Sequence, residues 1–129
     1  MTHHQHTGLQ CTWEIPITRR CYVEVFIWQD RASLYGALPE SEPCWGYALC
    51  SGCALNKDKC RMRLPRKFAE IHLIEGKFGS GIAAHEIQHV INHWCEVNAW
   101  TTVVHDEKIA RLARKLTRGF WNGFYEHYH

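Results

Sequence analysis

Two kinds of hydrophobic periodicity run along this chain, and they predict two kinds of element. Residues 21–29 read C-Y-V-E-V-F-I-W-Q, a run rich in β-branched and aromatic side chains that is typical of a buried strand. Residues 70–75 read E-I-H-L-I-E, and their alternation predicts a second, shorter strand. Residues 46–49 are a weaker candidate for a third strand. The central part of the chain is therefore expected to form a small sheet.

Further along, apolar residues recur every three or four positions, which is the spacing of an amphipathic helix. One helix is expected from about Gly81 to Cys95 and a second from about Asp106 to Tyr125. The apolar positions are Ile82, Ile87, Val90, Ile91 and Trp94 in the first helix, and Ile109, Leu112, Leu116, Phe120 and Phe124 in the second. The basic residues Arg111, Arg114, Lys115 and Arg118 are expected on the solvated face of the second helix.

The remaining segments suggest how the chain is organised. Residues 1–12 are polar and rich in histidine, so we expect a loose N-terminal arm. Residues 30–38 are expected to form one or two helical turns, and residues 44–60 a cysteine-rich loop. With 129 residues the chain fits a single domain, 1–129. The predicted fold class is α+β, with a small, mainly antiparallel sheet packed on the two helices.

Composition narrows the chemistry. Ten histidines and seven cysteines in so short a chain favour metal binding, whereas a net charge of +2 gives no argument for nucleic acid. No apolar run reaches the ~18 residues that a membrane span needs, and the first residues do not resemble a signal peptide. We therefore expect a cytoplasmic protein, in which thiols stay reduced and clustered cysteines are more often metal ligands than disulfides.

The sharpest motif is H-E-I-Q-H, formed by residues 85–89. Side chains four positions apart lie on one face of a helix, so His85 and His89 can both bind one zinc ion. Glu86 can then act as the general base towards a water whose pKa zinc has lowered. A five-residue pattern also arises by chance, but two histidines and a glutamate inside a core helix without partners would be costly. The motif therefore predicts a zinc-dependent hydrolase.

A catalytic zinc ion usually has three protein ligands, so a third must come from elsewhere. His93 continues the spacing of His85 and His89, but one more turn of a straight helix carries it away from the metal. Glu107, at the start of the next helix, is the preferred third ligand. Asp106 is the fallback, although its position also suits an N-cap.

At this point the sequence resembles a known group of enzymes. H-E-I-Q-H followed by D-E-K-I-A on a second helix is similar to the gluzincin branch of zinc metallopeptidases. The layout of residues 70–125 resembles small metallopeptidases encoded by phages and prophages and compact peptidase domains of the ImmA/IrrE type. The resemblance implies that His85, His89 and Glu107 bind zinc and that Glu86 is the general base. It also implies a minimal zincin-like core and, for a phage-encoded protein, the host cytoplasm.

The same resemblance extends to the substrate. It implies that the strand at residues 70–75 is an edge strand that holds an extended peptide. The residue that stabilises the transition state in such enzymes, a tyrosine or histidine, is not identified by any motif here. His72, His93 and Tyr125 are the candidates.

A second cluster of possible ligands precedes the motif. Cys44, Cys50, Cys53 and Cys60 are spaced C-x5-C-x2-C-x6-C, and the central C-S-G-C resembles a zinc knuckle. Four thiolates can close a tetrahedral structural zinc site, which would help a loop-rich segment of a small domain. The alternative is a set of free thiols or a single disulfide.

The sequence therefore supports two alternative functions. The first is a zinc metallopeptidase that hydrolyses a peptide or protein substrate. The alternative is a zinc-binding interaction module for a protein or nucleic acid, without catalytic activity, in which H-E-x-x-H is incidental. Oligomeric state and cleavage preference are not predicted.

Overall fold

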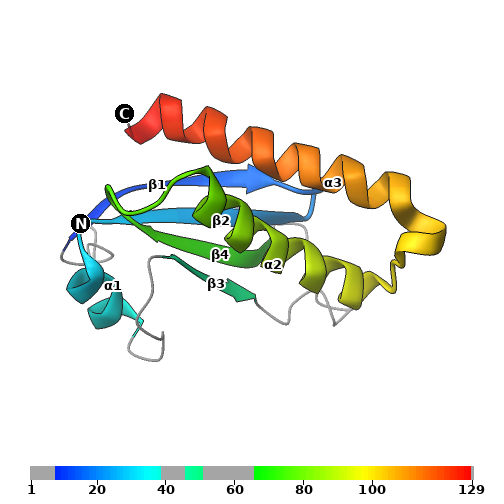
Figure 1. The fold of residues 1–129 in the computed structure, drawn as a ribbon, viewed down its shortest axis with the longest axis horizontal. Coiled ribbons are helices and arrows are strands. Elements are labelled where there is room, and N and C mark those ends of the chain that lie inside the picture. The colour runs from blue at the N-terminus through cyan, green and yellow to red at the C-terminus, as the bar shows by residue number, and fades with distance from the viewer. Residues whose placement is uncertain (1–7, 39–45, 51–65, 129) are drawn as a thin grey trace.

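The computed structural model describes residues 8–38, 46–50 and 66–128 (Figure 1). The elements, in chain order, are β1 (Leu9–Pro16), β2 (Cys21–Trp28), α1 (Arg31–Ala37), β3 (Gly46–Cys50), β4 (Arg66–Ile74), α2 (Ser80–Asn98), α3 (Thr102–Gly123) and a short π-helix, η3 (Phe124–Tyr128). The α+β class and the two long helices predicted from periodicity are confirmed.

The four described strands form one sheet in the order β1-β2-β4-β3. β1 pairs with β2 and β3 pairs with β4 in antiparallel fashion, whereas β2 and β4 are parallel. The sheet is therefore mixed, and two of its three pairings are antiparallel. Strand β4 lies in its interior, and β1 and β3 form its edges.

Helices α2 and α3 cover one face of this sheet (Figure 1). α2 packs on β3 and β4, and α3 packs on β1 and against α2. The core between these layers comes from alternate strand positions and from the apolar stripes of the helices. Its most buried members include Ile15, Val23, Val25, Ile27, Ile71, Leu73, Ala83, Val90, Leu116 and Phe120. Among the described helices, none has the length and apolar character to span a membrane.

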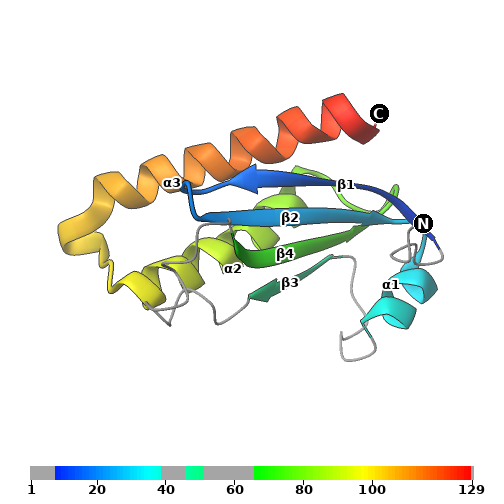
Figure 2. The ribbon, with the colours of Figure 1, turned by 180° about the vertical axis from the view of Figure 1, so that it is seen from behind.

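On the other face of the sheet, α1 is the one helix among the described residues, and it lies at one end (Figure 2). Asp30 caps α1 by accepting a hydrogen bond from the backbone N–H of Ser33 at 2.8 Å. Leu34 anchors the helix in a small second core with Trp28 and Ile74. The predicted helical turns at residues 30–38 are confirmed, and they leave most of this face of the sheet uncovered by described elements.

The predicted N-terminal arm is wrong over residues 9–12, which belong to β1. Trp13 and Ile15 of this strand are buried, and they alternate with exposed Glu14 and Pro16. The alternation extends over the whole strand, because Leu9 and Cys11 are half-buried and alternate with the exposed Gln10 and Thr12. β4 also begins four residues earlier than expected, at Arg66, because the segment pairs with β2 from Cys21 onwards.

Candidate metal centre

Helix α2 presents two histidines, one turn apart, on a side turned away from the sheet. Its buried positions are Ala83, Glu86, Ile87, Val90, Ile91 and Trp94. His85 and His89 are exposed. Their Nε2 atoms lie 3.1 Å apart, and the two rings are almost perpendicular, with an interplanar angle of 88°.

The two rings are at hydrogen-bonding distance from one another, and this separation is also close to the one that a shared metal ion requires. Two imidazole nitrogens, each ~2.0–2.1 Å from a tetrahedral zinc ion, lie roughly 3.3 Å from one another. The Nε2 atoms of His85 and His89 come within a few tenths of an ångström of that value. The donor chemistry also fits, because neutral imidazole is a common zinc ligand. The structure thus brings two of the predicted ligands together.

Glu86 lies beside this pair on the buried flank of α2, with 6% of its surface exposed. Among the described residues, no donor hydrogen-bonds to its carboxylate. Burial raises the pKa of Glu86, and the nearby imidazoles of His85 and His89 oppose that shift. A carboxylate whose pKa is raised towards neutrality is suited to accept and return a proton.

The proposed third ligands lie elsewhere. The Glu107 carboxylate is 3.8 Å from Nε of Arg111, and both side chains are about 70% exposed. Asp106 is exposed on the same turn. Nδ1 of His93 is 3.7 Å from the Glu96 carboxylate. Within the described ranges, no three His, Cys, Asp or Glu side chains gather closely enough to hold a metal ion. The structure therefore does not place Glu107, Asp106 or His93 with the histidine pair.

The position of Glu107 follows from a kink near the start of α3. His105 has non-helical dihedral angles, φ −113° and ψ 24°, so the turn before it and the helix after it are separate segments. Its ring stacks on Trp100 and its Nδ1 accepts a hydrogen bond from the backbone N–H of Thr101 at 3.1 Å. The predicted start of the second helix, Asp106, is thus the first residue after the kink.

The strand order of the sheet bears on the predictions made for residues 70–75 and for His72. β4 is not an edge strand, so the expected role of residues 70–75 in holding a peptide is wrong; within the described sheet, β3 is the edge beside α2. His72 is buried on the face opposite α2, where it stacks on Phe26. The sheet therefore separates it from His85 and His89. Tyr125 is 60% exposed in η3.

The cysteine cluster falls almost wholly outside the described residues. Cys44, Cys53 and Cys60 lie outside them, and for Cys50 the structure gives only its backbone position at the end of β3. The structural zinc site stays a prediction.

The chain matches no protein-family model, no curated protein sequence and no solved structure.

Proposed function

We propose that this chain is a zinc-dependent metallopeptidase with His85 and His89 as zinc ligands and Glu86 as general base. The observation that carries the proposal is the 3.1 Å approach of the two Nε2 atoms on an accessible helix face. The buried carboxylate of Glu86 beside them supplies the second half of the motif. Two helices on one face of a small mixed sheet, with β3 as the edge beside α2, support a minimal zincin-like core.

Glu107 is the proposed third ligand. It is held by one ion pair with Arg111, and both partners are largely exposed. Exposed pairs of this kind contribute about 0–1 kcal/mol, so the ion pair itself does little to hold the Glu107 carboxylate. Binding beside His85 and His89 would also require the backbone near the His105 kink to move. Asp106 remains the fallback because it is exposed on the same turn.

The chain's own residues would divide the reaction between them. A zinc ion held by His85 and His89 would supply Lewis acidity and lower the pKa of a water molecule. Glu86 accepts the proton of the attacking water and delivers it to the amide nitrogen as the C–N bond breaks. An extended peptide would add to the outer edge of β3, where backbone hydrogen bonds supply most of its binding.

The test separates metal binding from catalysis. Zinc content and peptidase activity on a denatured protein substrate are measured for the wild type, His85→Ala and Glu86→Gln. We expect His85→Ala to lose both zinc and activity. Glu86→Gln should keep its zinc and lose at least about a hundredfold in turnover, because it removes the base and leaves the ligands.

The matched control is Gln88→Ala, an exposed position inside the same motif whose side chain donates to Asn92 at 2.8 Å. It should retain both zinc and turnover. A wild type that binds no zinc would overturn the proposal. A wild type that binds zinc through His85 but hydrolyses nothing would favour the alternative, a zinc-binding interaction module.

A further inference from the structure

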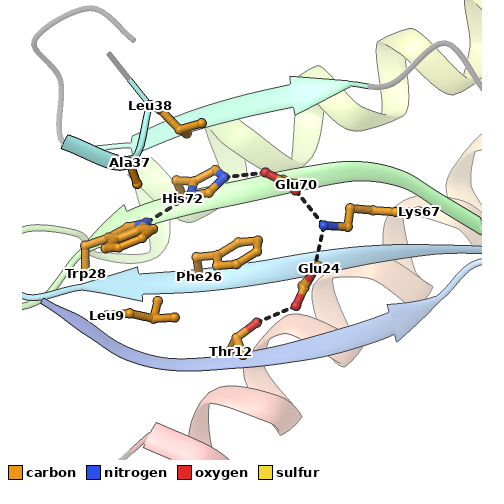
Figure 3. Close-up of a pocket in the computed structure, with 10 residues that line it drawn as sticks. All are labelled: Leu9, Thr12, Glu24, Phe26, Trp28, Ala37, Leu38, Lys67, Glu70 and His72. Atoms are coloured by element: carbon orange, nitrogen blue, oxygen red, sulfur yellow. Dashed lines mark hydrogen bonds and ion pairs between the residues drawn. The ribbon is translucent and has the colours of Figure 1, made fainter. Parts of the chain in front are cut away.

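The face of the sheet opposite α2 and α3 carries a continuous chain of polar contacts (Figure 3). The residues come from β1, β2 and β4. Glu70 and His72 are two residues apart on β4, and an irregularity in the β2–β4 register at Phe68 brings Lys67 to the same face. Thr12 donates to Oε2 of Glu24 at 3.0 Å, and Lys67 lies 2.8 Å from Oε1 of Glu24. Lys67 also lies 2.6 Å from Oε2 of Glu70, whose Oε1 is 2.8 Å from Nε2 of His72. These side-chain contacts link β1, β2 and β4 to one another.

Trp28 determines the protonation state at the end of this chain. Its indole N–H, which can only donate, bonds to Nδ1 of His72 at 2.9 Å. Nδ1 therefore carries no proton, and Nε2–H donates to Glu70. His72 is 2% exposed and is held as a neutral imidazole in one tautomer.

Within this network of described residues the charges do not cancel. Glu24 and Glu70 each carry a negative charge, Lys67 carries one positive charge, and His72 is neutral, so the network is anionic by one unit. Each of the four carboxylate oxygens accepts one bond from a described residue. A carboxylate oxygen has two lone pairs, so each retains room for another donor. The network therefore favours a ligand that is cationic and rich in N–H donors.

A hollow of about 510 Å³ adjoins the network. Figure 3 shows that its charged residues gather at one end and its apolar residues at the other. The apolar end is formed by Leu9, Phe26, Trp28, Ala37 and Leu38. The rings of Phe26 and His72 stack with centroids 4.4 Å apart, and Trp28 stacks beyond them. A volume of this size suits a small molecule with an apolar body.

We propose that this hollow binds a small organic cation, a primary amine in its ammonium form on an aromatic or aliphatic body. The ammonium group lies against Glu24 and Glu70, where it neutralises the excess charge and fills the remaining acceptor positions. The body lies among Phe26, Trp28 and Leu38, where aromatic rings also favour a nearby cation. The site is on the opposite face of the sheet from His85 and His89, so the inference does not depend on the proposed peptidase activity.

The direct test compares three probes of the same shape by titration calorimetry: 2-phenylethylammonium, the neutral 2-phenylethanol and the anionic phenylacetate. We expect saturable binding of the ammonium probe, about tenfold or more tighter than that of the alcohol, and no binding of phenylacetate. Equal affinity for the ammonium and the alcohol would show an apolar hollow only and would overturn the proposal. Failure of the ammonium probe to bind would also overturn it.

Two variants locate the site. Glu24→Gln removes one carboxylate and should weaken the ammonium probe about tenfold or more, with little effect on 2-phenylethanol. Ala37→Phe fills the apolar end without changing any charge, and it should abolish binding even if Glu24→Gln fails to fold. Glu96→Gln, on the exposed side of α2, makes the same change in net charge and should bind as the wild type does. Unchanged binding in both Glu24→Gln and Ala37→Phe would place the probe elsewhere.

Discussion

Two glutamates of this chain, the buried Glu86 and the half-buried Glu70, have opposite electrostatic environments. Glu86 has no described hydrogen-bond donor, and burial raises its pKa. At Glu70 the hydrogen bond from His72 has the largest effect and, with Lys67, it lowers the pKa to about 2 against the opposing effect of burial. For Lys67, burial acts to lower the pKa, but hydrogen bonds to Glu24 and Glu70 raise it overall. Donors stabilise a carboxylate's charge, and burial without donors destabilises it.

The Glu70 network predicts a specific pH dependence of stability. Because the folded-state pKa of Glu70 is about 2, below its usual value of 4.5, the ionised carboxylate stabilises the fold. This contribution is fully present above about pH 4.5 and is lost as the pH falls towards about 2; it amounts to at most about 3 kcal/mol. Glu70→Gln should therefore be destabilising at pH 7, and its difference from the wild type should shrink below pH 4.5.

Urea denaturation between pH 7 and pH 2.5 measures this difference. Glu96→Gln serves as the control, since its carboxylate is 80% exposed and should leave the pH profile unchanged. A destabilisation by Glu70→Gln that stays constant over the whole range would contradict the role given to the ionised carboxylate.

At the scale of elements, the close packing of α3 on β1 depends on two glycines. A Cβ atom at Gly119 would overlap the Ile15 side chain, and one at Gly123 would overlap the indole of Trp13. Both strand residues are almost fully buried, so neither can move aside easily. Lys115 adds a tether, donating to the backbone carbonyl of Ile17 at 2.8 Å. The closeness of helix and strand therefore requires the absence of a side chain at these positions.

Gly119→Ala should consequently destabilise the protein by about 1–3 kcal/mol, because overpacking forces the helix away from β1. The matched control is Gly81→Ala in α2, where a Cβ atom would meet nothing within 4 Å. That substitution should stabilise by up to about 1 kcal/mol, since alanine favours the helix. Thermal unfolding of both variants provides the comparison; equal effects of the two substitutions would show that α3 is not seated as described.

At the scale of the whole molecule, the sheet separates two candidate sites. The histidine pair is on α2, on the helical side, and the anionic hollow is on the opposite side, next to α1. The strands that line the hollow on one face of the sheet carry core residues on the other face. Ligands of the two sites would therefore have no shared contact, and each site can be altered without removing residues of the other.

The cysteine cluster bears on the stability of the whole chain. If Cys44, Cys50, Cys53 and Cys60 hold a structural zinc ion, replacing Cys50 and Cys53 by serine should remove that ion and lower the melting temperature. The zinc bound through His85 should remain. Metal analysis and thermal unfolding of the double variant and of His85→Ala distinguish the two sites. Unchanged melting together with unchanged zinc content would exclude the structural site.

The sequence alone determined what depends on neighbours within a few positions. Periodicity located the strand at 21–29 and both long helices, because each element places its apolar residues at its own regular spacing. The contact of His85 with His89 was equally predictable, since one helical turn brings residues four apart together.

Only the tertiary structure decided the rest. The parallel pairing of β2 with β4 joins segments that are far apart in the sequence, with α1 and β3 between them, and it places the expected edge strand in the interior of the sheet. The position of Glu107 depends on the kink at His105, which no local sequence pattern predicted. The anionic hollow joins Thr12, Glu24 and Lys67 from three strands, and its residues are neighbours only after the sheet has formed. Such contacts are set by strand order and register, which follow from the packing of the whole chain rather than from spacing within any one segment.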